Sequence, residues 1–529
     1  MRIKLNVTVL SVGALALLGT PSVFWGASGD PKMAPIVPAS LPQLNAVDER
    51  FQSYNIEMVE VTGGRFWKPY ASKGEAKPTD ANQPAGLSPS LFEYRPPINL
   101  SNARLRKLAA ALGPTYVRVS GTWANTTYFQ NSDEPAPATP PKGFGAVLTR
   151  PEWKGVIDFA NAVDARIVTS FSTGAGTRDD AGVWTPNQAQ QFLDYTKSAG
   201  GSIAAAEFMN EPTFAEMGGA PKGYDATAYG RDFAVFRAFI KQSAPNMLIL
   251  GPGGVGEGSA LLPPSMHAIT TPAILAITGP AFDRFSYHTY GAVSSRCAAM
   301  GGDASTSSDA ALSADWLSRG AANFDFYAGI RDFLSRGKGM WLTETAQAAC
   351  GGDRWASTFL DSFRYLNQLG SLAQKGLQVH MHNTLASSDY GLLDEKTYEP
   401  RPNYWAALLW RRLMGTTVLD PGDSPSPSLH LYAHCMRSEP GGVVLLAINA
   451  SKDETKTLEI NSASDRYTLT AKELMGTAVE LNGSELKLGA DDALPELKSV
   501  AAHAGKTAFA PLSITFLAFP KAHDANCLQ

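Results

Sequence analysis

The sequence predicts an α/β protein in which a (β/α)8 TIM barrel is followed by an antiparallel β-sandwich domain. Two patterns indicate this fold. From about residue 51 to 415, short β-branched runs alternate with stretches whose apolar residues recur at helical spacing. From 416 to 529, strand-like runs follow one another without helices between them. With 529 residues, 44% of them hydrophobic, the chain is long enough for two folding units.

Eight runs are predicted to form the barrel strands. In chain order they are YNIEMVEV, TYVRVSG, RIVTSFST, AAEFMNE, NMLILGP, DRFSYHTY, MWLTET and LQVHMHN. Between them lie amphipathic stretches such as NARLRKLAAALG and EWKGVIDFANAVDA, as expected for helices that connect parallel strands. An open doubly wound sheet is the competing topology.

The Pro- and Ser-rich stretch GTTVLDPGDSPSPS marks the approximate boundary of the second domain, which is assigned to 416–529. Its predicted strands are LHLYAHCM, GGVVLLAIN, KTLEI, YTLTA, VELNG, ELKL and PLSITFLAF, a succession typical of an antiparallel sandwich. The segment 30–50, which precedes the barrel, can run back and add a strand to this domain.

The N-terminus has a basic start, MRIK, then an apolar stretch, then small residues from Ala27 to Gly29. We interpret residues 1–29 as an export signal, which predicts a periplasmic or secreted protein with no membrane association in its mature form. A membrane-spanning helix is the alternative. The formal net charge of −4, without long runs of Lys or Arg, argues against nucleic acid as a partner.

Export permits disulfides, and four cysteines allow three pairings. None of the spacings is of the C-x-x-C kind and no histidines cluster beside them, so a zinc site is not expected. We favour Cys297 with Cys350 and Cys435 with Cys527. Buried thiols are the alternative for either pair.

Polar side chains recur at the C-terminal ends of the predicted barrel strands, where active sites of this fold lie. They are Glu57, Thr122, Asn210, Glu211, His288, Tyr290, Glu344, His382 and Asn383. A packed barrel gains nothing from ionisable strand ends, so these residues predict a pocket for a polar substrate. His288 and His382 are either sugar ligands or satisfied histidines of the barrel rim.

Two of these carboxylates predict glycoside hydrolysis. Glu211 ends the fourth strand in FMNEPT, and Glu344 ends the seventh in MWLTETAQ. Acetal cleavage needs one carboxyl that protonates the departing oxygen and another that attacks or stabilises the anomeric carbon. We assign Glu211 as acid/base and Glu344 as the nucleophile. Asn210 is placed to donate to the sugar 2-hydroxyl, and no metal or organic cofactor is needed.

These residues also carry a resemblance to the heparanase and β-glucuronidase family, glycoside hydrolase family 79. The motifs that carry it are SYNIEMVEVTGGRFW, YVRVSGTWANTTYF, FMNEPT, SYHTYG, WLTETAQAACGGDRW and SSDYGLLDEKTYEPRPNYWAALLWRRLMGTTVL. The resemblance implies a retaining barrel hydrolase with a β-sandwich, acting on β-linked glucuronic acid. It implies the same roles for Glu211 and Glu344 and a contact between Tyr290 and the nucleophile. Cys435 and Cys527 lie where the family often has a closing disulfide.

For substrate binding, the resemblance implies that Glu57 and Thr122 bind sugar hydroxyls. It further implies that the uronate carboxylate is received by Tyr390, Gly351 and Gly352. Free backbone N–H groups can hold an anion without a cation, and glycine permits close approach. Animal heparanases have an aromatic residue and three glycines here, whereas this chain reads ACGG at 349–352, which leaves the register open by one residue. The alternatives are a plain turn for the glycines and an interior aromatic for Tyr390.

The expected partner is an oligo- or polysaccharide that contains glucuronic acid. The chain has no cluster of adjacent Lys and Arg residues for long sulfated chains, which favours an exo-β-glucuronidase or an enzyme for short or weakly sulfated uronide chains over heparanase-like endo action on long sulfated chains. Two alternatives remain. One is a retaining barrel hydrolase of a neutral sugar, of the xylosidase or arabinofuranosidase type, and the other is an exported carbohydrate-binding protein without catalysis.

Overall fold

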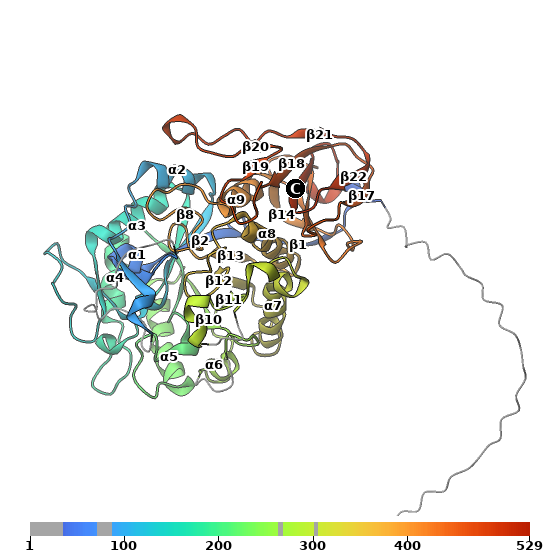
Figure 1. The fold of residues 1–529 in the computed structure, drawn as a ribbon. Coiled ribbons are helices and arrows are strands. Elements are labelled where there is room, and N and C mark those ends of the chain that lie inside the picture. Colours follow the sequence, from blue (N-terminus) through green and yellow to red (C-terminus); the bar gives the residue numbers. More distant parts are fainter. Residues whose placement is uncertain (1–34, 71–86, 263–267, 301–304, 529) are drawn as a thin grey trace, which may run out of the picture. The chain divides into compact units, whose positions relative to one another are not determined.

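A computed structural model describes residues 35–70, 87–262, 268–300 and 305–528 (Figure 1). The predicted export signal at 1–29 lies outside the described residues, as does the start of segment 30–50. Within the described ranges, no helix combines the length and the apolar character that a bilayer crossing requires.

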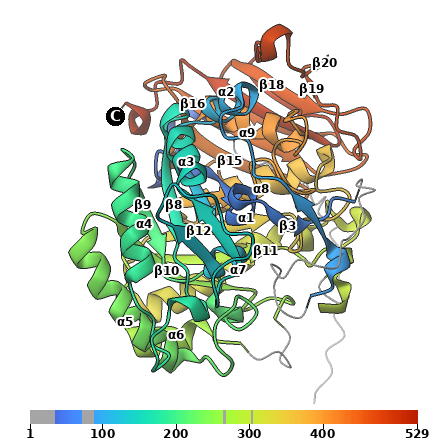
Figure 2. The same ribbon diagram turned by 90° about the vertical axis from the view of Figure 1, so that its left-hand side faces the viewer.

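Eight parallel strands close into a barrel, which confirms the predicted (β/α)8 architecture (Figures 1 and 2). Around the barrel they are β2 (Gln52–Glu57), β5 (Thr115–Ser120), β8 (Ala165–Ser170), β9 (Ile203–Glu207), β10 (Leu248–Val255), β11 (Arg284–Tyr290), β12 (Met340–Ala346) and β13 (Val379–His382). The ring closes where β13 pairs in parallel with β2.

Helices follow the barrel strands on the outside. They are α2 (Ala103–Ala111), α3 (Arg150–Ala162), α4 (Asn187–Ser198), α5 (Ala226–Ser243), α6 (Thr271–Thr278), α7 (Ala314–Leu334), α8 (Phe359–Gln374) and α9 (Pro402–Leu413). Their starts follow local sequence signals. Asn102 accepts a hydrogen bond from the N–H of Leu105 at the start of α2, and Thr149 forms a capping box with Glu152 at the start of α3.

Apolar side chains fill the barrel interior below the strands' C-terminal ends. They are Tyr116, Val168, Ala205, Leu250, Trp341, Val379 and Met381, and the rings of Tyr116 and Trp341 lie 4.8 Å apart. Because this packing occupies the lower barrel, polar side chains have room only further along the strands.

Two predicted strands end earlier than expected. The run YNIEMVEV is strand only to Glu57, and Met58–Thr62 form the short helix α1. The Glu60 carboxylate accepts a hydrogen bond from the N–H of Glu57 at 2.7 Å, which favours a helix start at this point. Likewise β9 ends at Glu207, so Glu211 lies in the loop beyond it, with a left-handed φ of 47°.

Two short sheets are inserted after β2 and β5. In the first, β3 (Gly64–Trp67) pairs antiparallel with β4 (Phe92–Arg95). In the second, β6 (Thr127–Gln130) pairs in parallel with β7 (Ala146–Thr149), across the Pro-rich segment 131–145. Both insertions follow strands whose C-terminal ends carry predicted site residues.

The C-terminal part is an antiparallel sheet, as predicted. In spatial order its strands are β1 (Gln43–Ala46), β14 (Met414–Leu419), β15 (Leu429–Met436), β16 (Val443–Asn449), β23 (Ser513–Phe519), β18 (Ser464–Thr470), β19 (Glu480–Leu481) and β20 (Ser484–Glu485), with β21 (Val500–Ala502) beside β18. A second small sheet joins β17 (Lys456–Ile460) to β22 (Gly505–Phe509). Strand β1 comes from the segment ahead of the barrel and pairs with β14.

Two disulfides connect distant parts of the chain. Cys297 and Cys350 join the loops after β11 and β12, and Cys435 joins β15 to Cys527 near the C-terminus. These are the pairings that the sequence favoured. The first bridge fastens two neighbouring loops at the end of the barrel where site residues are expected.

The barrel and the antiparallel sheet meet without a gap at helix α8. The hydroxyl of Tyr432, on β15, donates to Oδ1 of Asn367 at 2.6 Å. Gly370 faces the ring of the same tyrosine, and a Cβ added at this glycine would lie 2.2 Å from Cγ of Tyr432. A side chain at position 370 would therefore separate α8 from β15.

We expect Gly370→Ala to destabilise the protein by about 1–3 kcal/mol, because the added methyl overpacks the contact with Tyr432. Gly329→Ala is a matched control, since it also lies in a helix but an added Cβ there meets nothing within 4 Å. Alanine should stabilise that exposed helical position by about 0.5–1 kcal/mol. Thermal unfolding midpoints test both variants, and a midpoint for Gly370→Ala at or above that of the wild type would contradict the packing.

Candidate active site

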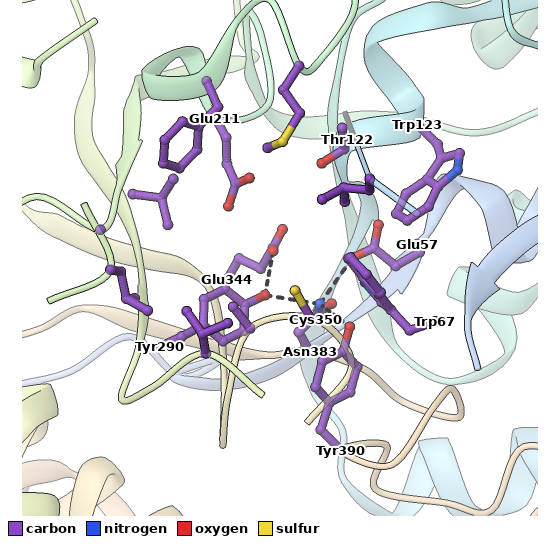
Figure 3. Close-up of a pocket in the computed structure, with 18 residues that line it drawn as sticks. Glu57, Trp67, Thr122, Trp123, Glu211, Tyr290, Glu344, Cys350, Asn383 and Tyr390 are labelled. Atoms are coloured by element: carbon purple, nitrogen blue, oxygen red, sulfur yellow. Dashed lines mark hydrogen bonds between the residues drawn. The ribbon is translucent and has the colours of Figure 1, made fainter. Parts of the chain in front are cut away.

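A cavity opens at the C-terminal ends of the barrel strands (Figure 3). The predicted site residues that line it are Glu57, Thr122, Glu211, Tyr290, Glu344 and Tyr390, joined by Asn383. The predicted residues that lie behind this lining are Asn210, His288, Gly351, Gly352 and His382. Seven of the eight barrel strands, all but β8, supply described lining residues at or beyond their ends.

The two predicted catalytic carboxylates face each other in this cavity (Figure 3). A carboxylate oxygen of Glu211 and one of Glu344 lie within 4.8 Å of each other. They are 133 positions apart along the chain, and the closed barrel brings them together from β12 and from the loop after β9. Two carboxyls at this distance can act on opposite sides of one bond.

Glu344 is held by two donors. The hydroxyl of Tyr290 donates to its Oε1 at 2.5 Å, and Nη1 of Arg118 donates to its Oε2 at 2.9 Å. Both groups donate to carboxylate oxygens, and the guanidinium brings a positive charge that complements the carboxylate. Glu344 is therefore oriented and stabilised as an anion.

Glu211 has the opposite environment. Burial, and next the negative charge of Glu344, raise the pKa of the Glu211 carboxyl, although a hydrogen bond with His288 lowers it in part. The distance from Nδ1 of His288 to Oε1 of Glu211 is 3.0 Å. The raised pKa of Glu211 is the direction expected for a proton donor, and it lies beside a carboxylate that is held by two donors.

His288 contacts both carboxylates from beneath the cavity. Burial opposes its charged form, but the charge of Glu344 and hydrogen bonds with Glu207 and Glu211 raise the pKa of His288 to about 9. The imidazole is fully buried. It therefore positions Glu211 as a cation, and it does not reach the cavity as a sugar ligand.

The sequence reading missed a buried ion pair below the site. Arg118 on β5 donates to Glu207 on β9 through Nη2 at 2.8 Å, and both side chains are 1% exposed. Nη2 of Arg118 also donates to Oδ1 of Asn210 at 2.7 Å. The available signal was a charged residue inside each apolar strand run, YVRVS and AAAEF, because a buried charge requires a partner.

Glu57 and Asn383 form the polar side of the cavity. Nδ2 of Asn383 donates to Oε1 of Glu57 at 3.0 Å and to the Tyr390 hydroxyl at 3.2 Å. Burial and the charge of Glu344 raise the pKa of Glu57 well above its usual range. Gly121, with a φ of 91°, permits this arrangement, since a Cβ there would lie 1.5 Å from Oε2 of Glu57.

Three buried polar atoms around the cavity have no hydrogen-bond partner among the described residues. They are Oε2 of Glu57, Nδ2 of Asn210 and Oδ1 of Asn383. Buried polar atoms are normally satisfied, so a donor or acceptor group of a ligand is the expected partner for each. The site is thus prepared for a molecule with several hydroxyl groups.

The turn after β12 differs from the predicted carboxylate site by one residue. Gly352 is already engaged, because its N–H donates to the carbonyl oxygen of Ala348 at 3.2 Å. Cys350 lines the cavity instead, with a φ of 63° followed by 83° at Gly351. No acceptor in the described chain is recorded for the N–H groups of Cys350 and Gly351. Gly352 is therefore corrected to a structural turn residue.

His382 is also corrected from a possible sugar ligand to a supporting residue. Its Nε2 hydrogen-bonds the carbonyl oxygen of Tyr390 at 2.8 Å, and the ring is fully buried behind the cavity. Burial, followed by the charge of Arg364, lowers the pKa of His382 to about 3. The neutral imidazole holds the backbone of Tyr390, whose side chain lines the cavity.

Ligand atoms of Glu211, His288 and Glu344 lie close enough together for a metal ion. The charges around them do not favour one, because Arg118 already donates to Glu344 and the pKa of His288 is raised. Cation binding would require His288 to lose its proton. The group is better suited to proton transfer.

Comparison with known proteins identifies the family. The family described as "Glycosyl hydrolase family 79, N-terminal domain" matches residues 97–370, just over half of the chain. The chain belongs to glycosyl hydrolase family 79. As a member of this family it is an enzyme that hydrolyses glycosides.

Relatives of this family 79 enzyme cover much of its length. Heparanase-like protein 1 of Arabidopsis thaliana is 27% identical over 490 residues, which cover 81% of this chain and 86% of the relative. Baicalin-beta-D-glucuronidase of Scutellaria baicalensis is 33% identical over 189 residues, covering 34% of this chain and 36% of the relative.

A solved structure shares the fold. A 4-O-alpha-L-rhamnosyl-beta-D-glucuronidase from Fusarium oxysporum 12S superimposes with a TM-score of 0.63 at 13% identity, covering 91% of this chain and 99% of that one. At this identity the likeness shows the architecture of barrel and antiparallel sheet.

The raised pKa of His288 predicts a pH-dependent stability. The pKa rises from 6.5 to about 9 in the folded protein, so the stabilising contribution is fully present below pH 6.5 and is lost as the pH rises through 9. The thermal midpoint of the wild type should therefore fall relative to that of His288→Gln between about pH 6.5 and 9. Parallel midpoint curves over this range would contradict a charged His288.

Proposed function

We propose that this family 79 enzyme is a retaining β-glucuronidase with Glu211 as acid/base and Glu344 as nucleophile. The observation that carries the proposal is the approach of the two carboxylates to within 4.8 Å. Retaining glycosidases have carboxyls about 5–5.5 Å apart, whereas inverting enzymes need about 6.5–9.5 Å to admit a water molecule. The short separation favours double displacement.

In the first step, the Glu344 carboxylate attacks the anomeric carbon and the bond to the leaving oxygen breaks. Glu211 gives its proton to that oxygen, so the leaving group departs as an alcohol and a glycosyl ester with Glu344 remains. Arg118 and Tyr290 hold Glu344 in the ionised form that this attack requires. Asn210 is placed to donate its unpartnered Nδ2 to the 2-hydroxyl.

In the second step, water replaces the leaving group. Glu211, now a carboxylate, takes a proton from the water, whose oxygen attacks the anomeric carbon and releases Glu344. The sugar departs with its original β configuration, and Glu211 is again protonated. The raised pKa of Glu211 suits both roles, because the group must hold a proton first and accept one later.

A uronate carboxylate fits the remaining features of the cavity. Cys350 lines the cavity and its N–H can donate to an anion, with the N–H of Gly351 next in the same turn, and Tyr390 lines the same cavity. The relatives support the same substrate class, since they include a heparanase-like protein and a β-D-glucuronidase. Two disulfides support an exported protein.

Two other functions predict different results. A hydrolase of neutral sugars would use the same carboxylates without an anion site, and a carbohydrate-binding protein would bind without turnover. The environment of Glu211 favours catalysis, because burial and the charge of Glu344 raise the pKa of its carboxyl, as a proton donor requires, and binding alone needs no such shift.

We expect Glu344→Ala to lose activity on 4-nitrophenyl β-D-glucuronide by a factor on the order of 10⁴ or more. Azide should restore turnover and yield the α-glucuronyl azide, because it attacks from the side that Glu344 occupied. The azide product is identified by NMR. A product with β configuration, or wild-type activity in the variant, would contradict the assigned nucleophile.

Glu211→Ala should lower kcat/KM, which reports the first step, about 10²–10⁴-fold on glucuronides whose leaving group needs protonation, and much less on β-D-glucuronyl fluoride. The fluoride ion departs without a proton, so the comparison isolates the acid role. Equal losses on both substrates would contradict this role for Glu211.

Recognition of the carboxylate predicts a preference between matched sugars. The wild type should hydrolyse 4-nitrophenyl β-D-glucuronide far faster than the matching glucoside. Tyr390→Phe should reduce that preference about 10- to 100-fold, because a hydrogen bond to a charged group is lost. Tyr467→Phe, in the antiparallel sheet, is the control. A wild type that prefers the glucoside would favour the neutral-sugar alternative.

A further inference from the structure

One side of the cavity mouth is apolar. Phe214 and Met217 line the cavity after β9, and Val255 and Leu261 line it at the end of β10 and beyond. These four side chains form an apolar wall. The two loops are joined, since the N–H of Val255 donates to Oγ1 of Thr213 at 3.0 Å.

The opposite side of the cavity carries the polar groups that can bind a sugar, with Trp67 and Trp123 beside Glu57 (Figure 3). In the order of the closed barrel, β9 lies opposite β13 and β10 lies opposite β2. Asn383 and Tyr390 follow β13, and Glu57 ends β2. Figure 3 shows Glu211 across the cavity from Asn383 and Tyr390. A sugar that bonds to the polar side therefore directs its leaving group towards the apolar wall.

The described charged residues that line the cavity are all acidic. Glu57, Glu211 and Glu344 line it, and none of the described lining residues is Lys or Arg. The guanidinium of Arg118 lies below, 1% exposed and paired with Glu207 and Glu344. A sulfate or carboxylate on the leaving group would meet carboxyl groups, with no Lys or Arg among the described lining residues to compensate its charge.

We infer that the apolar wall binds the leaving group and that the substrates are glucuronides of uncharged, flat, apolar alcohols such as aromatic hydroxy compounds. The inference rests on the proposed function, because Glu211 protonates the leaving oxygen and the leaving group must then lie beside Glu211. Phe214 and Met217 follow Glu211 within six positions. A phenyl ring and a thioether both pack well against an aromatic face.

Exposure of the wall supports this assignment. Phe214, Met217 and Leu261 are half-buried in the free protein, so part of their apolar surface faces the open cavity. Burying that surface against an apolar group is favourable, whereas a hydrated sugar would gain little from it. The wall therefore selects the leaving group by hydrophobic contact.

Two leaving groups of the same shape test the inference. 2-Naphthyl β-D-glucuronide and its 6-sulfonated analogue differ in charge, and β-D-glucuronyl fluoride reports on the sugar site alone. We expect kcat/KM for the naphthyl substrate to exceed that for the sulfonated one about tenfold or more. Equal values with the fluoride still hydrolysed would overturn this inference alone. Loss of fluoride hydrolysis would overturn the proposed function itself.

Two substitutions of Met217 test the wall directly. Met217→Ala should lower the ratio of kcat/KM for the naphthyl substrate to that for the fluoride about three- to tenfold. Met217→Lys should shift the preference towards the sulfonated substrate about tenfold. Phe333→Ala removes a side chain that is 87% exposed on α7 and serves as the control. Ratios equal to those of the wild type in both Met217 variants would overturn the inference.

Discussion

The buried guanidinium of Arg118 is the interaction on which the rest of the site depends. It lies inside the barrel between Glu207 and Glu344, and a charge in that position is tolerated only when it is paired and hydrogen-bonded. Together with a protonated His288 it supplies two positive charges for two anions, Glu207 and Glu344. The local charge is then balanced when Glu211 and Glu57, whose pKa values are both raised, hold their protons. Neutrality of the buried cluster thus favours the protonation states that glycoside cleavage requires.

The barrel makes this balance possible because it brings strand ends together that are remote in the sequence. Arg118, Glu207 and Glu344 come from three strands that share one interior, above an apolar packing that closes the lower barrel. The outer part of the cavity then divides between polar and apolar sides. On the proposed function, the residues at the bottom of the cavity carry out the reaction. The residues of its polar and apolar sides select the substrate.

Much of the fold could be predicted from the sequence, because strand and helix periodicities are local. The eight barrel strands and the change to an antiparallel sheet follow from such patterns. The ends of the strands were harder to predict. Glu57 is both the last residue of β2 and the residue before α1, and the hydrogen bond from its N–H to the Glu60 carboxylate marks where the strand gives way to the helix. The left-handed backbone of Glu211 has no local signal beyond the proline that follows it.

The facing carboxylates could be predicted from the sequence, because acetal cleavage requires two carboxyl groups and two predicted barrel strands end in glutamate. The hydrogen bonds around them could not, because their partners are distant in the chain. Asn210 was expected to donate to the sugar, but no pattern showed that Arg118 engages its oxygen and leaves Nδ2 unpartnered among the described residues. Gly352 was expected to offer its N–H, yet the carbonyl oxygen of Ala348 accepts it. Such competition within the fold appears in no sequence pattern.

The bridge between Cys297 and Cys350 has a consequence for biogenesis. Cys350 is at once half of a covalent link and part of the cavity surface. Chains that leave the ribosome reduced lack this link, so the two rim loops are joined covalently only after thiol oxidation. On the proposed function, the same oxidation fastens the turn that is placed to receive the uronate carboxylate.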